Sequence, residues 1–115
     1  MTQRLILDIQ DHQTYEQIYV KQNTKDFNVE FEITKNKEYL NITGCTALFE
    51  MEKPDKTTVV KPCTISNNVV SVEIDEQVTD VCGKGNFQIT LIKGDVKIST
   101  TTNVIKIEKF ALSNN

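Results

Sequence analysis

A chain of 115 residues suits a single domain that can bury a core without disulfides or a metal ion, so we expect residues 1–115 to form one domain. A net charge of −3 without long runs of Lys or Arg gives no general attraction to a phosphate backbone, and nucleic acid is therefore not expected as a partner. Apolar runs are too short for a membrane span, and Asp8 and Asp11 interrupt the apolar start before a signal peptide could form, so we expect no membrane contact and synthesis in the cytoplasm.

The amino-terminal arm, residues 1–17, contains the first predicted strand. Apolar residues at every second position share one face of it: Leu5, Leu7 and Ile9. Ile6 makes the other face apolar as well, which favours an edge strand or arm that can pair with a partner. On this interpretation, removing residues 1–9 would leave folding largely intact and weaken association.

The clearest alternation follows at residues 26–35, after Ile18 and Val20, which predict a second strand. The inward-facing residues of this segment are Phe27, Val29, Phe31 and Ile33. Polar residues lie between them, so the strand is expected to have one buried and one solvated face. Residues 35–37 then turn the chain.

The next two strands are predicted to form a hairpin. Residues 45–52 alternate small or apolar residues with polar ones, and Leu48 is the apolar exception on the outward face. Pro54 presets its φ for a turn, and the Asp55 side chain can accept hydrogen bonds from the turn backbone. The sequence therefore predicts a hairpin loop at residues 53–57 that leads into a strand at residues 57–61.

Residues 75–82 break the alternation, because Val78 and Val81 are three positions apart after an acidic start, and this spacing predicts one helical turn. The other expected elements are a turn at 66–68, strands at 70–74, 86–93 and 96–110, and a polar tail at 111–115. The apolar parity of the last strand changes near Thr102 and Asn103, which predicts a bulge or kink there.

Short strands separated by turns every 8 to 12 residues or so predict an all-β fold. The expected architecture is an antiparallel β-sandwich, immunoglobulin-like in outline, with one short helical turn near residues 75–82.

Residues that could perform chemistry are few and scattered. The single histidine, His12, lies in a polar stretch without a nucleophile beside it, so a solvated loop histidine is the better interpretation. The three cysteines lack zinc-ligand spacing and are expected to be free thiols: Cys45, Cys63 and Cys82. The acidic group at residues 75–80 lacks the ligand pattern of an EF-hand and is better explained as a helix cap. We therefore expect a non-enzymatic protein without a metal ion or a cofactor.

Apolar and tyrosine side chains in the strands and the arm are the candidate contacts for a protein partner, because such residues dominate interface hot spots. They are Leu5, Ile6, Leu7, Tyr15, Tyr19, Tyr39 and Leu48. The chain has no Trp, which disfavours sugar binding. An immunoglobulin-like carbohydrate-binding or cell-surface adhesion domain stays the alternative.

Four short motifs occur in a fixed order. They are Phe-x-Val-x-Phe-x-Ile-Thr-Lys-Asn at 27–36, Leu-x-Ile-Thr-Gly at 40–44, Glu-Lys-Pro-Asp-x-Thr at 52–57 and Gly-Lys-Gly-x-Phe-x-Ile at 83–89. With these motifs, residues 18–109 resemble the amino-terminal domain of phage upper baseplate proteins, the BppU family.

The resemblance implies a structural, non-catalytic module that docks an upper baseplate or receptor-binding assembly onto the tail-tip hub through protein contacts. The implied partners are other baseplate and tail proteins, and the implied location is the tail baseplate of the virion after synthesis in the cytoplasm of a bacterial host. Whether the chain forms a homo-oligomer in such an assembly stays open. The family has no catalytic motif, and no site residue is transferred from it.

Overall fold

The computed structural model describes residues 2–10 and 17–110, and within them the chain forms ten strands and one short helix. The elements are β1 (Thr2–Asp8), β2 (Gln17–Lys21), β3 (Phe27–Lys35), β4 (Glu38–Tyr39), β5 (Thr46–Glu52), β6 (Thr58–Ser66), β7 (Val69–Ile74), α1 (Glu76–Thr79), β8 (Gly83–Lys93), β9 (Val96–Ser99) and β10 (Asn103–Glu108). The predicted all-β class with a helical turn near residues 75–82 is confirmed.

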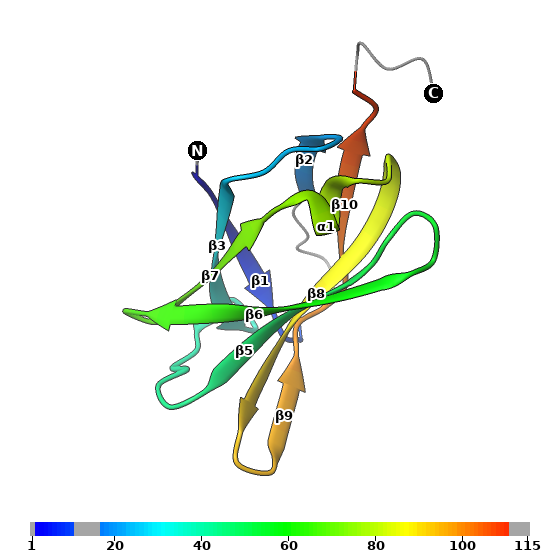
Figure 1. The fold of residues 1–115 in the computed structure, drawn as a ribbon. Coiled ribbons are helices and arrows are strands. Elements are labelled where there is room, and N and C mark those ends of the chain that lie inside the picture. Colours follow the sequence, from blue (N-terminus) through cyan, green and yellow to red (C-terminus); the bar gives the residue numbers. More distant parts are fainter. Residues whose placement is uncertain (1, 11–16, 111–115) are drawn as a thin grey trace.

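The strands form one continuous, curled sheet (Figure 1). Their order is β1-β3-β7-β6-β5-β8-β10-β2, with β4 beside β3 and β9 beside β8. Strand β6 joins the two halves, because its residues 58–63 pair with β5 whereas residues 64–66 pair with β7. A strand shared in this way makes one sheet that curls around its own core. The immunoglobulin-like sandwich of two separate layers therefore stays a prediction.

Two strand pairs are parallel, which corrects the expectation of an antiparallel sheet at both ends of the strand order. Strand β1 runs parallel to β3, and β2 runs parallel to β10. A parallel pair needs a crossover connection, and here the chain crosses from one end of the sheet to the other between β1 and β2. Side-chain alternation is the same in both orientations, so the sequence pattern carries no information about strand direction.

Three buried phenylalanines hold the two halves of the sheet together. Phe31 of β3, Phe49 of β5 and Phe87 of β8 are each almost completely shielded from solvent. The ring centroid of Phe87 lies 5.4 Å from that of Phe49 and 5.9 Å from that of Phe31. These are favourable distances for aromatic pairs, so Phe87 contacts both halves of the core. The inward-facing set predicted for β3 is confirmed.

The predicted turns are confirmed in their local chemistry. Two hairpins have two consecutive turn residues at positive φ: Asn36 and Lys37 between β3 and β4, and Asn67 and Asn68 between β6 and β7. In the β5–β6 loop, the Asp55 carboxylate accepts hydrogen bonds from the backbone N and the Oγ1 of Thr57, at 3.1 and 2.6 Å. The last strand, predicted as one strand with a bulge or kink near residues 102–103, is interrupted at residues 100–102 and forms two separate strands, β9 and β10.

Helix α1 closes the end of the sheet opposite the β8–β9 hairpin (Figure 1). Asp75 caps it and accepts a hydrogen bond from the backbone N of Gln77 at 3.0 Å. The other carboxylate oxygen of Asp75 forms an ion pair with Lys61 of β6 at 2.5 Å. Lys53, which follows β5, pairs with Asp80 at the end of the helix. The acidic group that the sequence assigns to a helix cap therefore ties α1 to the β5–β6 hairpin.

Candidate functional site

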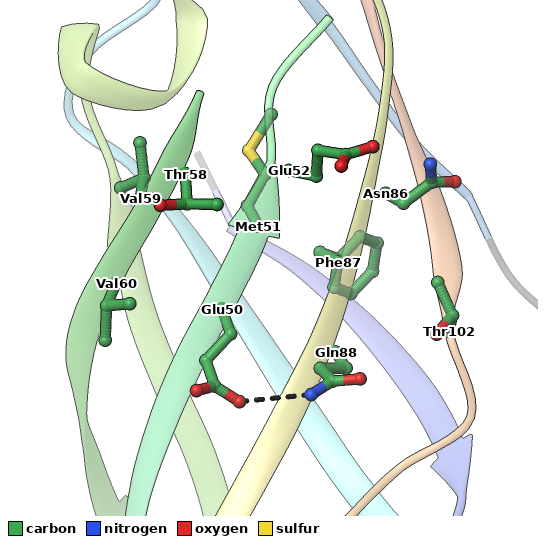
Figure 2. Close-up of a pocket in the computed structure, with 10 residues that line it drawn as sticks. All are labelled: Glu50, Met51, Glu52, Thr58, Val59, Val60, Asn86, Phe87, Gln88 and Thr102. Carbon is green, nitrogen blue, oxygen red and sulfur yellow. Dashed lines mark hydrogen bonds between the residues drawn. The ribbon is translucent and has the colours of Figure 1, made fainter. Parts of the chain in front are cut away.

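One hollow on the surface lies over strands β5, β6 and β8 and has a volume of about 460 Å³. Figure 2 shows its polar side chains, among which the Glu50 carboxylate accepts a hydrogen bond from Gln88 Nε2 at 3.1 Å. The same oxygen also accepts a hydrogen bond from Thr90 Oγ1. These bonds lower the pKa of Glu50 below its ordinary value, and the bond from Thr90 has the largest effect. Glu50 is therefore ionised at neutral pH and cannot donate a proton as a general acid.

The most buried carboxylate of the described residues has a structural position. Asp8, at the end of β1, accepts hydrogen bonds from Thr34 Oγ1 and from the backbone N of Lys37, both at 2.7 Å. It also accepts from the backbone N of Gln10 at 2.7 Å and of Asn36 at 3.1 Å. Asp8 therefore joins the end of β1 to the β3–β4 turn. From the sequence, this residue is noted only as an interruption of the apolar start.

The geometry of the described residues gives little support for a reactive cysteine or a metal site. Cys45, Cys63 and Cys82 are free thiols, as expected, and all three are half-buried. Burial raises the pKa of Cys63 to about 12, which keeps it protonated and unreactive at neutral pH. Among residues 2–10 and 17–110, His, Cys, Asp and Glu side chains form no group that could hold a metal ion. His12 lies outside the described residues.

A second hollow, of about 400 Å³, is mainly apolar and lies at the end of the molecule with the β8–β9 hairpin. Its lining residues come from the β4–β5 connection and from the hairpin: Leu40, Asn41, Ile42, Cys45, Leu91, Lys93, Val96 and Ile98. The side chains of Val96 and Ile98 are 56% and 38% exposed. An apolar depression with exposed aliphatic walls has the properties of a pocket that receives an anchor side chain of a protein partner.

The candidate contact residues predicted from the sequence are distributed over several places. Ile6 and Tyr19 are exposed and lie on β1 and β2, the two strands that end the strand order. Tyr39 is exposed on β4. Leu48 is half-buried on β5, opposite Pro62 and Thr90. These residues come from four different strands. Tyr15 lies outside the described residues.

Leu5 and Leu7 are corrected from candidate contacts to core residues. Their side chains are 2% and 1% exposed, because β1 pairs with β3 and turns this face towards the interior. The alternation of residues 4–9 places both side chains on one face of the strand, but it does not show whether that face is buried or exposed to a partner. The edge position of β1 is confirmed, since it ends the strand order.

Val96 and Ile98 are exposed apolar residues that the sequence does not indicate as contacts. By parity, Ile98 belongs to the inward set of the last strand, and in the sheet it does share the inner face with Leu91. It is exposed because the hairpin projects beyond the opposing strands (Figure 1). The exposure of Ile98 depends on the tertiary arrangement, and the local sequence pattern does not contain this information.

Comparison with known proteins matches the chain to a family and shows a solved structure with a similar fold. The family described as the BppU N-terminal domain matches residues 1–114. The N-terminal domain of ORF48 of phage TP901-1 has a similar structure, with a TM-score of 0.74 and 13% sequence identity over 95% of this chain and 100% of that chain. At this identity the likeness shows the fold alone. No curated protein is similar enough to be matched. The part of the chain that the structure describes has no helix long and apolar enough to cross a membrane.

Proposed function

Because the chain belongs to the BppU N-terminal domain family and so has a structural role in a phage tail baseplate, we propose that it is the module that docks an upper baseplate or receptor-binding assembly onto the tail-tip hub. The observation that carries this proposal is the family match, which extends over residues 1–114 and so includes every strand. Contacts with other tail proteins, and not chemistry, are the proposed activity.

The geometry supports a role in protein contacts. The three most buried aromatic rings interlock in the core, which gives a preorganised body that loses little conformational freedom on binding. Exposed Tyr19, Tyr39 and the apolar hollow offer anchors of the kind that contribute most to interface affinity. The acidic groups with the most contacts, Glu50 and Asp8, serve internal hydrogen bonds.

The proposal is tested by mixing the purified chain with the purified hub protein encoded by the same phage. We expect a complex that co-elutes in size-exclusion chromatography and a Kd of about 1 μM or tighter by biolayer interferometry. A tail-tube protein of the same phage serves as the control surface, to which the chain should not bind.

Failure to bind the hub at about 100 μM would contradict docking. A positive signal on a glycan array under the same conditions would favour the carbohydrate-binding alternative. Antibodies against the chain should label the tail tip of intact virions in electron micrographs, and labelling of the capsid or of the host alone would contradict a place in the baseplate. Synthesis in the host cytoplasm is part of the same proposal.

A further inference from the structure

In the part of the chain that the structure describes, strand β9 is an edge strand with one unpaired side. It pairs with β8 through Val96, Lys97, Ile98 and Ser99, and the strand order gives it no second neighbour. In Figure 1, β8 lies along one side of β9 at the projecting end of the molecule. A strand in this position presents a row of backbone N–H and C=O groups that another extended chain can pair with.

The hydrogen bonds around β9 show which backbone groups point outward. Thr100 N donates to Ile89 O of β8 at 2.9 Å, whereas Thr101 N donates in the other direction, to Asp8 O at 3.1 Å. Successive residues of a strand direct their N–H and C=O groups to opposite sides. Lys97 and Ser99 have the same parity as Thr101, so their backbone groups point away from β8.

The side chains beside this edge are apolar on one face. Val96 and Ile98 lie on the inner face and form a wall of the apolar hollow, and both are substantially exposed. A strand added beside β9 would place every second side chain on the same inner face, over these two residues. The hollow of about 400 Å³ has room for one or two such side chains.

The charge of the hairpin favours an acidic neighbour. Residues 90–99 contain Lys93 and Lys97 and one acidic residue, Asp95, whereas the whole chain has a net charge of −3. Lys97 lies on the outer face and is exposed, and its charge also acts on the carboxylate of Glu50, where it helps to lower the pKa. A lysine on a short edge strand hinders indiscriminate pairing and admits a partner that has a carboxylate at the adjacent position.

We propose that the outer edge of β9 is the docking edge of this domain, and that it takes up an extended segment of the hub protein as an added strand. That segment has apolar residues at alternate positions over Val96 and Ile98 and an acidic residue beside Lys97. The inference rests on the proposed docking function and specifies the surface and the mode of pairing.

The test uses the full chain with the purified hub protein, and two substitutions at one position. Lys97→Pro removes an N–H that points away from β8, so it leaves the β8–β9 pairing intact while blocking an added strand. Lys97→Ala removes the charge and keeps the N–H. We expect Lys97→Pro to weaken hub binding at least tenfold or so and Lys97→Ala to weaken it by no more than about threefold. The circular dichroism spectrum and melting temperature show that each variant is folded.

A second measurement does not depend on variants. In hydrogen exchange followed by mass spectrometry, the amides of Lys97 and Ser99 should exchange rapidly in the free chain and become protected in the complex, while the amide of Ile98, which points to β8, changes little.

Three other outcomes overturn the proposal. If both Lys97 variants bind the hub as tightly as the wild type does, and protection from hydrogen exchange appears elsewhere in the chain, the β9 edge is not the docking edge. Docking itself then stands. If the chain alone forms a dimer by light scattering that Lys97→Pro abolishes, the edge pairs with a second copy. If the wild type does not bind the hub, the docking function fails together with this inference.

Discussion

Strand β1 is predicted to be required for folding, although the sequence pattern presents it as a removable arm. Leu5 and Leu7 are almost completely buried, and replacing a buried Leu by Ala costs about 2–5 kcal/mol of unfolding free energy. The two side chains share one face, so their losses are not strictly additive, and the double variant should lose about 4–8 kcal/mol. A domain of this size has a total stability of about 5–15 kcal/mol, so the double variant is expected to be largely or partly unfolded.

The assay is urea unfolding followed by far-ultraviolet circular dichroism, because the chain has no Trp for fluorescence. Leu5→Ala and Leu7→Ala are measured singly and together. Ile6→Ala is the matched control, since Ile6 lies between them in the same strand with a side chain that is 44% exposed. It should cost less than about 1 kcal/mol.

A double variant within about 1 kcal/mol of the wild type would refute this assignment of β1 to the core. The same reasoning reverses the expectation for deleting residues 1–9, which would remove Leu5, Leu7 and the Asp8 bonds to the β3–β4 turn. We expect this deletion to unfold the domain, so it cannot serve as a test of docking.

Three further outcomes concern the core, a thiol and a carboxylate. Phe87→Leu should cost about 1–2 kcal/mol in urea unfolding, because it removes two aromatic pairs while keeping most of the apolar volume, and a loss below about 0.5 kcal/mol would contradict the central place of that ring. In a variant whose only cysteine is Cys63, the thiol should react with Ellman's reagent at pH 8 at least about 100-fold more slowly in the folded protein than in urea, because its pKa is raised to about 12; equal rates would contradict its burial. The pKa of Glu50 is lowered in the folded state by the bonds from Thr90 and Gln88, so its contribution to stability is present above the ordinary carboxyl pKa and is lost as the pH falls through the lowered value. Glu50→Gln should therefore reduce the acid sensitivity of the melting temperature below about pH 4, and an unchanged pH profile would contradict this role.

Much of the local structure is predictable from the sequence, because each strand has one buried face. The alternation in residues 26–35 identifies the four inward side chains of β3. The Asn and Lys residues of the two hairpins and the Asp55 turn follow from local backbone chemistry. Helix α1 is predictable from the spacing of Val78 and Val81, of which Val78 lies in the helix, and from its acidic cap Asp75.

The arrangement of the strands is not predictable in the same way. Parallel and antiparallel neighbours show the same alternation, so the pairing of β1 with β3 and of β2 with β10 has no local signal. For this reason the sequence places Leu5 and Leu7 on one face of the strand but assigns that face to a partner contact, whereas it lies in the core. The apolar hollow is missed because Val96 and Ile98 are inward by parity, and their exposure depends on the tertiary arrangement of the hairpin.

The pairing of β2 with β10 has a consequence for how the protein is made. β2 leaves the ribosome well before β10, yet β10 is its sole strand neighbour in the described part of the chain. A nascent chain therefore cannot close its sheet until residues 103–108 have emerged, and before that point β8 and β2 both have exposed borders. Copies truncated before residue 103 should therefore be recognised by chaperones and proteases or precipitate.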